Sequence, residues 1–302
     1  MPRVSVGKDP RNWIHHLAAG ADSHLVLAAH FEQTVNVWDL ASRKNIGAFE
    51  THLDIGGKRL ALSPDGSVCF AGAYRRYGIA AYLVASGIRV WERRDLKAVQ
   101  YVSLSPGGRR VYCGLSSRPL HVLDSKSGET LEQLHGIRQV TESPFDASRL
   151  LDGTRLTLVR PRRKSRKIER GSFAVLDAAF SPGCLLLSES DSRLRCIDLD
   201  DGVELWSFRH RSAHALDVAF APALNAAVTL VGHYGTVRGG YNIFRLDMDT
   251  GSPTHVARAQ YGYAAAFCDH GRKCVLADGS VVSTEDRKTV FRFPLPPYSS
   301  SS

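Results

Sequence analysis

The chain is 302 residues long, is 43% hydrophobic and carries a formal net charge of +9. This length allows one large all-β domain or two small domains, and the hydrophobic content is sufficient for a real core. No stretch approaches the roughly 18 to 20 apolar residues of a membrane helix, and the first residues, MPRVSVGKDPRNW, lack the apolar run of a secretory signal, so we expect a cytoplasmic protein with no membrane association.

The positive charge is concentrated in one stretch. Residues Arg160 to Arg170 include seven basic residues and one acid, Glu169, a local charge of +6 that leaves +3 for the rest of the chain. The basic balance is therefore a local feature and does not by itself indicate a nucleic-acid-binding protein.

The six cysteines form no CxxC pair and lie mostly inside apolar runs typical of strands. This pattern predicts buried, reduced thiols, without a disulfide framework or a metal site. The cysteines are Cys69, Cys113, Cys184, Cys196, Cys268 and Cys274.

The first unit of the chain extends from Trp13 to Phe49. It contains an apolar run, a turn at Gly20 to Ser23, a second apolar run, the alternating segment Thr34 to Leu40, and a last strand through Phe49. Period-two runs separated by turn residues, with no room for a helix, predict four antiparallel strands.

Five Ser-Pro or Ala-Pro turns then recur along the chain at Pro64, Pro106, Pro144, Pro182 and Pro222, at intervals of 42, 38, 38 and 40 residues. This is the period of a four-stranded propeller blade. The clearest unit is Phe173 to Phe208, and a final unit without the proline extends from Tyr263 to Phe293. The count predicts an all-β, seven-bladed β-propeller of four-stranded antiparallel blades, with six or eight blades as alternatives.

We expect residues 13–297 to form this single domain, because closing the ring buries the faces and edges of each blade. Residues 1–12 form an amino-terminal arm in which Val4 to Val6 is a candidate latch strand. Residues 298–302 form a disordered serine tail after prolines that cannot continue a strand.

Several segments resemble the WD-repeat β-propeller family: TVNVWDL at Thr34 to Leu40, SDSRLRCIDLDDG at Ser190 to Gly202, and the SPDG turn at Ser63 to Gly66. The family's Trp-Asp pair is matched by Trp38-Asp39, and other units place Leu123-Asp124, Ile197-Asp198 and Leu246-Asp247 there. The resemblance implies hydrogen-bonded residues that lock a blade; the matching positions are Thr34, Trp38, Asp39, Asp191 and His214. Glu32 replaces the family's aspartate in the first unit, and no unit shows the complete set. Tyr77 to Trp91 and Asp201 to Phe208 equally resemble more divergent propellers, including the quinoprotein type.

Two turns are longer than the repeat requires. Tyr74 to Tyr77 interrupts the second unit and His233 to Gly240 interrupts the sixth, and both should lie at the end of the ring opposite the Ser-Pro turns. Their composition favours an interaction surface. The alternative, that they are simply solvated loops, fits the same composition. The candidate partner-binding residues are Arg75, Arg76, Tyr77, His233, Tyr234 and Arg238.

The basic run lies on the fourth unit, at the Ser-Pro end and along the outer edge. It either protects an edge strand from aggregation or attracts an acidic protein or a nucleic acid. No aromatic residues alternate with its basic residues to stack on bases, so sequence-specific nucleic-acid recognition is not expected. The residues of this patch are Arg160, Arg162, Arg163, Lys164, Arg166 and Lys167.

No catalytic pattern is present: the chain has no GxSxG elbow and no P-loop, and the pairs His15-His16 and His210/His214 lack carboxylates to complete a metal site. We therefore expect no cofactor, no metal and no enzymatic activity. The predicted function is a monomeric, non-catalytic platform that binds one partner protein through loops on one face.

Two alternatives stay open. An inhibitor or immunity-type protein would neutralise an acidic partner, which the positive charge and an Ala-, Arg- and Leu-rich composition typical of bacteria would suit. A hydrolase or lactonase-like enzyme would place its site in the central channel.

Overall fold

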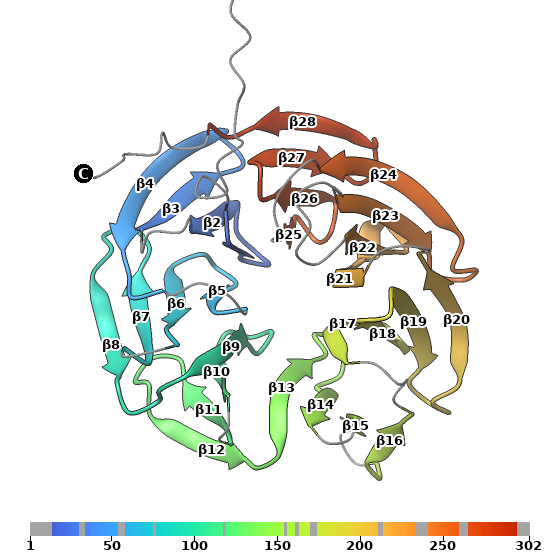
Figure 1. Cartoon of the computed structure of the whole chain (residues 1–302), viewed down its shortest axis with the longest axis horizontal. Coiled ribbons are helices and arrows are strands. Elements are labelled where there is room, and N and C mark those ends of the chain that lie inside the picture. Colours follow the sequence, from blue (N-terminus) through green and yellow to red (C-terminus); the bar gives the residue numbers. More distant parts are fainter. Residues whose placement is uncertain are drawn as a thin grey trace, which may run out of the picture.

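The computed structural model of the chain describes residues 14–29, 34–53, 58–74, 77–116, 119–153, 156–160, 163–169, 174–210, 214–232, 241–259 and 265–294. These residues form seven four-stranded antiparallel sheets arranged as the blades of a ring (Figure 1). The seven-bladed β-propeller that the repeats predict is confirmed.

Each blade uses four strands that are consecutive in the chain, with the first strand at the channel and the fourth at the rim (Figure 1). Blade 1 contains β1 (His16–Ala19), β2 (Leu25–Ala29), β3 (Thr34–Asp39) and β4 (Lys44–Glu50); blade 2 contains β5 (Leu60–Leu62), β6 (Val68–Gly72), β7 (Ile79–Leu83) and β8 (Arg89–Arg93). Blade 3 contains β9 (Val99–Leu104), β10 (Arg110–Leu115), β11 (Leu120–Asp124) and β12 (Thr130–Leu134); blade 4 contains β13 (Ile137–Glu142), β14 (Arg149–Gly153), β15 (Leu156–Val159) and β16 (Arg166–Ile168). Blade 5 contains β17 (Val175–Ser181), β18 (Cys184–Glu189), β19 (Arg193–Asp198) and β20 (Glu204–Arg209). Blade 6 contains β21 (His214–Ala221), β22 (Ala226–Gly232), β23 (Tyr241–Asp247) and β24 (Pro253–Ala259), and blade 7 contains β25 (Ala265–Cys268), β26 (Lys273–Leu276), β27 (Ser280–Ser283) and β28 (Lys288–Arg292).

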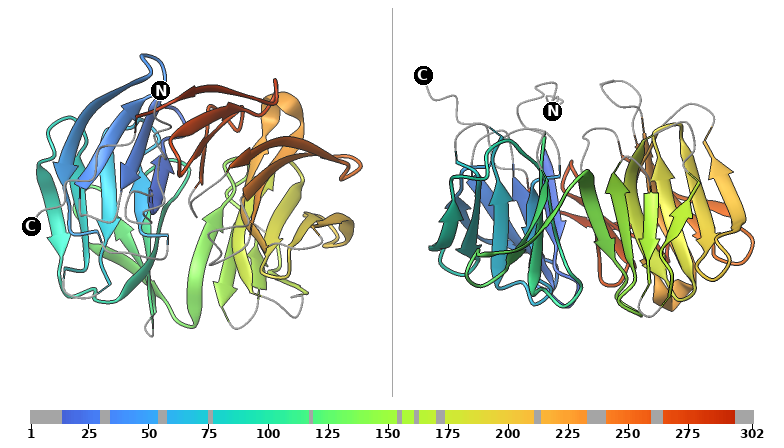
Figure 2. Two further views of the ribbon diagram at one scale, coloured as in Figure 1. Left: turned by 45° about the horizontal axis from the view of Figure 1, so that its top comes forward. Right: turned by 90° about the horizontal axis from the view of Figure 1, so that it is seen from below.

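The antiparallel order gives the ring two distinct ends, which the side view separates (Figure 2). The turns after the first and third strands, including the Ser-Pro turns, share one end, which we call the Ser-Pro end. The second-to-third connections and the connections between blades lie at the opposite end. The sequence predicts this division, since strands that alternate in direction must alternate the ends of their turns.

The turn after the third strand repeats one local structure. In blade 5 the Asp198 carboxylate accepts hydrogen bonds from the backbone N–H groups of Asp200, at 2.6 Å, and Asp201, at 3.0 Å, and Gly202 follows with φ of 73°. Asp39, Asp124 and Asp247 accept equivalent bonds. An aspartate that bonds the backbone two residues ahead stabilises such a turn, so these positions of the repeat serve the turn itself.

Tryptophans of two outer strands dock on this turn in the next blade. The Trp206 indole Nε1 donates to the Met248 carbonyl at 2.6 Å, and Trp91 Nε1 donates to the Ser125 carbonyl at 2.9 Å. A Cβ added to Gly251 would lie 2.7 Å from the Trp206 ring, so glycine is required there both by its φ of 68° and by the contact. The sequence repeat thus sets how neighbouring blades pack as well as how each blade folds.

A buried ionic contact joins blades 3 and 4. The Glu142 carboxylate on β13 pairs with Arg149 Nε at 2.9 Å and Arg110 Nη1 at 3.3 Å, and it accepts a short hydrogen bond from the Tyr112 hydroxyl. Glu142 leaves only 9% of its side chain exposed. Two cations and a hydroxyl compensate its charge, which a buried carboxylate needs.

The ring closes between blades 7 and 1 by side-chain packing, since both blades contain four strands of their own. Trp38 and Phe293 are fully buried in this seam and their rings stack with centroids 4.4 Å apart. Val26, Val275 and Val281 complete the apolar cluster. The candidate latch, Val4 to Val6, lies outside the described residues, as do the predicted arm and the predicted tail.

Because Phe293 is fully buried in this seam, we predict that Phe293→Ala lowers the free energy of unfolding by about 3–5 kcal/mol, as expected for a large fully buried side chain. Urea denaturation followed by circular dichroism measures the change. The matched control is Ile88→Ala, immediately before β8, where the side chain is 63% exposed and the change should stay within about 0.5 kcal/mol. A loss below 1 kcal/mol for the phenylalanine variant, on the order of the control, would show that the seam does not hold the ring.

Candidate functional site

The long turn of blade 2 places two tyrosines at the end opposite the Ser-Pro turns. Tyr74 is 40% exposed and Tyr77 is 39% exposed. The Arg59 guanidinium lies over the Tyr74 ring, 5.3 Å from its centroid, and the His52 ring stacks on Tyr77 at 4.1 Å with an interplanar angle of 13°. Each tyrosine is therefore held against a neighbouring side chain of the ring and still remains partly exposed.

The backbone of the blade 2 to blade 3 connection, which contains Arg94 and Lys97, runs close to the turn that holds these tyrosines. A Cβ on Gly78 would lie 2.0 Å from the Arg93 carbonyl oxygen, which shows how closely this connection approaches the tyrosine turn. Arg94 keeps 66% of its side chain exposed while pairing with Glu92, and Lys97 is exposed and forms no ion pair among the described residues. We call Tyr74, Tyr77, Arg94 and Lys97 the tyrosine patch.

The other residues predicted to bind a partner are not placed. Arg75, Arg76, His233, Tyr234 and Arg238 lie outside the described residues. The strand ends on either side of them, at Gly72 and Ile79 in blade 2 and at Gly232 and Tyr241 in blade 6, are at the end opposite the Ser-Pro turns. The patch therefore contains Tyr77 of the predicted set, and adds Tyr74, Arg94 and Lys97 to it.

Part of the predicted basic patch packs between blades 4 and 5. Arg160 Nη1 donates to the Leu199 carbonyl at 2.6 Å and to Asp200 at 2.9 Å, and Arg163 pairs with the same carboxylate at 2.6 Å. The Arg166 side chain lies against Gly202. Lys164 and Lys167 are exposed, and Arg162 lies outside the described residues. Most of the placed arginines thus fasten the short outer edge of blade 4 to the turn of blade 5.

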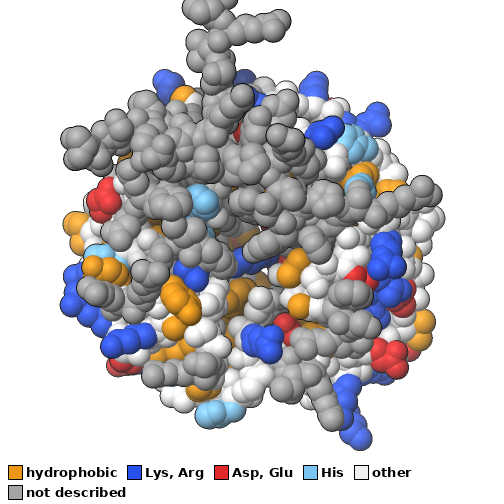
Figure 3. All heavy atoms as spheres, viewed as in Figure 1, with side chains coloured by type: hydrophobic (Ala, Val, Ile, Leu, Met, Phe, Trp, Pro, Cys, Tyr) orange, Lys and Arg blue, Asp and Glu red, His pale blue; other side chains and the backbone are white. Residues whose placement is uncertain are grey.

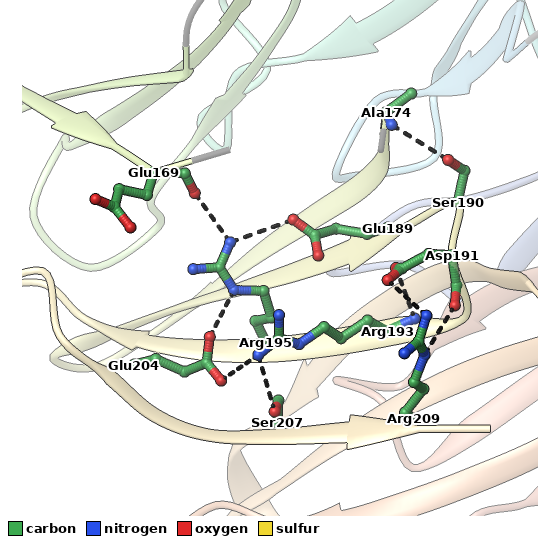
Figure 4. A network of polar contacts seen from close by, with 10 residues as sticks. All are labelled: Glu169, Ala174, Glu189, Ser190, Asp191, Arg193, Arg195, Glu204, Ser207 and Arg209. Atoms are coloured by element: carbon green, nitrogen blue, oxygen red, sulfur yellow. Dashed lines mark hydrogen bonds and ion pairs between the residues drawn. The ribbon is translucent and has the colours of Figure 1, made fainter. Parts of the chain in front are cut away.

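Asp191 belongs to a polar network on blade 5 (Figure 4). Its carboxylate accepts a hydrogen bond from the Arg193 N–H at 3.2 Å and pairs with Arg209 at 3.3 Å. Close by, Arg195 is 8% exposed and reaches Glu189 at 3.2 Å, Glu204 at 2.8 Å and, in blade 4, the Glu169 carbonyl at 3.0 Å (Figure 4). Because two carboxylates neutralise its charge, we interpret Arg195 as a structural residue that links the strands of blade 5 to each other and to blade 4.

The residues that the WD resemblance implies make different contacts in blade 1. Thr34 Oγ1 donates to Glu50 at 2.6 Å, and Asp39 accepts hydrogen bonds from Ala41 N–H at 2.8 Å and from the Ser42 hydroxyl at 2.9 Å. Trp38 Nε1 has no hydrogen-bond partner in the described part of the chain. The His214 backbone pairs with Gly232 in the sheet, and its side chain lies outside the described residues.

The central channel holds a charged cluster that sequence reasoning missed. The Lys58 ammonium, at the entry to β5, lies 3.0 Å from Asp177 Oδ1 on β17 and 2.5 Å from Asp217 Oδ1 on β21. Blade 2 is thereby joined across the channel to blades 5 and 6. Basic and hydrophobic side chains are visible at the centre of the ring (Figure 3). We call Lys58, Asp177 and Asp217 the channel cluster.

The protonation of the channel cluster follows from its surroundings. Burial lowers the pKa of Lys58, but attraction to Asp177 and Asp217 outweighs this and raises the pKa above its ordinary value. Burial raises the pKa of Asp177, Lys58 lowers it, Asp217 raises it again, and the net pKa lies above the ordinary range. Burial also raises the pKa of the neighbouring Tyr101 to about 12. The lysine is therefore held charged between two carboxylates, one of which resists ionisation.

The signal for two of the three members of this cluster was present in the sequence. Asp177 and Asp217 each stand five residues before their turn proline, at Pro182 and Pro222, so the repeat places them on neighbouring first strands at one level. The Asp177 Oδ2 atom also accepts a hydrogen bond from the Val218 N–H at 3.0 Å. Lys58 could not be paired with them, because blade 2 is their neighbour only across the closed ring.

A cavity of about 320 Å³ lies in the channel toward the Ser-Pro end. The first strands and turns of blades 1 to 3 line it, with apolar walls that include Leu17, Leu60 and Val102. Ser103 and Ser105 are the polar side chains in this lining. No group of three or more His, Cys, Asp or Glu side chains that could hold a metal ion occurs within the described ranges.

The fold and these sites define a seven-bladed β-propeller with an aromatic patch at one end and a charged channel. No protein-family model matches the chain. Among the helices of the described residues, none has the length and apolar character to cross a membrane.

The raised pKa of Asp177 makes a prediction about stability and pH. A carboxyl that binds its proton more tightly when folded contributes stability that is present at low pH and is lost as the pH rises from about 4 through the raised pKa. Asp177→Asn removes this titration, and the amide oxygen can still accept from Val218. The free energy of unfolding of the variant, relative to the unsubstituted protein, should therefore increase between pH 4 and pH 8. Urea unfolding across this range measures the difference.

Lys58→Met provides the contrast, since it leaves the two carboxylates without their cation. We expect it to lower the free energy of unfolding at pH 7 by about 1–3 kcal/mol, less than for a fully buried pair because 42% of the lysine side chain stays accessible. A constant difference for Asp177→Asn at all pH values, together with a neutral Lys58→Met, would contradict the coupling.

Proposed function

We propose that this protein is a non-catalytic platform that binds one partner protein through the tyrosine patch. The observation that carries the proposal is the pair of half-exposed tyrosines, each supported on one face by a side chain of the ring, Arg59 under Tyr74 and His52 against Tyr77.

Supported tyrosines suit protein recognition for a physical reason. Tyrosine offers a large apolar surface and a hydroxyl that forms hydrogen bonds, and it is enriched among the residues that dominate interface energies. A side chain already held in place by its neighbours loses less conformational entropy when a partner binds. The rigid ring beneath supports both tyrosines in the same way.

The charge of the patch favours an acidic partner. Arg94 and Lys97 add exposed cations, Arg75 and Arg76 stand next to Tyr74 and Tyr77 in the sequence, and the chain has a net charge of +9. Opposite charges accelerate association and make it sensitive to salt. An inhibitor or immunity-type protein that neutralises an acidic partner is the narrower form of this proposal.

The channel supports a second candidate, an enzyme or small-molecule-binding propeller. Its supporting observation is the convergence of Lys58, Asp177 and Asp217 next to an apolar cavity, since ligand sites combine apolar walls with a few polar groups. We rank it second because each charged group of the cluster is already engaged by another.

We also infer a divergent relationship to WD-repeat propellers, supported by the aspartates that end the third strands and bond to the following turn. A monomeric state, a cytoplasmic location and a bacterial source stay predictions from the sequence.

The double variant Tyr74→Ala/Tyr77→Ala tests the docking surface. If each tyrosine contributes about 2 kcal/mol, affinity for the captured partner should fall by on the order of 1,000-fold. Affinity capture from the native cell, quantified by mass spectrometry, first identifies proteins retained by the unsubstituted protein, and titration of the purified partner then measures the loss.

Phe145→Ala is the matched control, because Phe145 is an aromatic residue at the Ser-Pro end with 46% exposure. It should bind like the unsubstituted protein. Equal binding by the double variant and the control would remove the tyrosine patch from consideration, and binding that is indifferent to salt would count against an acidic partner.

A further inference from the structure

Lys58 and Arg59 are consecutive residues that serve two different sites. Lys58 belongs to the channel cluster, where its ammonium lies 3.0 Å from Asp177 Oδ1 and 2.5 Å from Asp217 Oδ1. Arg59 supports the tyrosine patch, with its guanidinium carbon 5.3 Å from the centroid of the Tyr74 ring. One short stretch of backbone, at the entry to β5, therefore connects the channel to the end of the ring opposite the Ser-Pro turns.

Hydrogen bonds hold the backbone of this stretch to a strand on each side. The Val102 N–H on β9 donates to the Lys58 carbonyl at 2.6 Å. The Gly72 N–H at the end of β6 donates to the Arg59 carbonyl at 2.9 Å, and Gly72 stands two residues before Tyr74 in the chain. A displacement of Lys58 is therefore transmitted to Arg59 and to the strand end that carries the tyrosine.

The Arg59 side chain has little freedom to adjust by itself. It is 4% exposed, and its Nη2 atom donates to Gln100 Oε1 at 3.3 Å. A guanidinium within about 6 Å of an aromatic centroid is attracted to the face of the ring. Because the side chain is enclosed, the position of its guanidinium over Tyr74 follows the position of its backbone.

Tyr77 provides an internal comparison, because its support has a different origin. Its ring stacks on His52, which lies in the connection from blade 1 to blade 2. The next residue, Leu53, is buried in the apolar cluster shared by these two blades. His52 therefore has an anchor of its own, and Tyr77 should keep its support when the contacts of Lys58 are lost.

We propose that Lys58 is a positioning residue for the tyrosine patch. Its ion pairs with Asp177 and Asp217 hold the backbone at the entry to β5. That backbone in turn holds Arg59 against Tyr74. The inference rests on the proposed docking role of the patch, to which it adds a control from the channel. Partner binding should also strengthen the ion pairs, because a coupling free energy between two sites is reciprocal.

Fluorine NMR of the full-length protein labelled with 3-fluorotyrosine tests the positioning without a partner. Tyr74→Phe and Tyr77→Phe assign the two resonances. In Lys58→Met, the Tyr74 resonance should move toward the frequency of the urea-unfolded protein, while the Tyr77 resonance stays in place. Lys58→Arg keeps the cation and should restore the Tyr74 resonance. Equal responses of the two tyrosines, or no response of Tyr74, would overturn the proposal, since a general loss of stability affects both.

Asp217→Asn approaches the same contact from the opposite side of the channel and does not depend on the folding of a lysine variant. Asp217 lies on β21 in blade 6 and is the carboxylate nearest to the Lys58 ammonium. Its replacement should displace the Tyr74 resonance in the same direction as Lys58→Met. An unchanged Tyr74 resonance in this variant would show that the ion pairs do not control the position of Arg59.

The affinity of the captured partner is the second readout. Lys58→Met should weaken it by roughly 2- to 30-fold, and Lys58→Arg should bind like the unsubstituted protein. If Tyr74→Ala/Tyr77→Ala weakens binding and Lys58→Met does not, the docking surface stands and the positioning role is wrong. If the Tyr74 resonance moves as expected and the double tyrosine variant still binds normally, Lys58 positions Tyr74 but the docking surface lies elsewhere.

Discussion

The architecture depends on side-chain packing between blades. Every sheet ladder in the described residues joins strands of one blade, so neighbouring blades are held by interlocking side chains and docked turns, with a single isolated bridge between Lys58 and Tyr101 as the exception. Three kinds of contact hold neighbouring blades together. They are the packing of Trp206 on Gly251, the ion pairs of Glu142 with Arg110 and Arg149, and the stacking of Trp38 on Phe293. Opening one seam of such a ring exposes the apolar surface that two neighbouring blades bury there.

The same constraint explains where function can reside. The faces of each blade are buried against its neighbours. The ends of the ring and the channel are therefore the surfaces that stay accessible for recognition. At the end opposite the Ser-Pro turns, Tyr74 and Tyr77 stand on side chains that the ring holds in place. In the channel, Lys58 forms ion pairs with Asp177 and Asp217, and these ion pairs connect blade 2 to blades 5 and 6. The apolar cavity lies toward the Ser-Pro end. The two regions therefore differ in chemistry, one aromatic and basic, the other internally neutralised.

The fold could be predicted because its information is local and repeated. One turn in each of blades 2 to 6 is marked by a proline, and the alternation of apolar and polar residues between these turns identifies strands. The prolines are Pro64, Pro106, Pro144, Pro182 and Pro222. The site was predicted only in part. Tyr77 could be found from an extended turn, but the pairing of Lys58 with Asp177 depends on a distance across the ring, which no spacing in the sequence encodes. The positive charge of the basic run was visible in the sequence. The ion pairs of Arg160 and Arg163 with Asp200 could not be predicted, because they depend on the position of the next blade.

Amide hydrogen exchange of the protein, alone and bound to its captured partner, tests the docking surface most directly. Binding through the tyrosine patch should slow exchange at Tyr74, at Tyr77 and Gly78, and along the connection from Arg94 to Ala98, and leave the turns of the Ser-Pro end unchanged. Protection confined to those turns, for example at Ser105 to Gly108, with none around Tyr74 and Tyr77, would contradict the assignment.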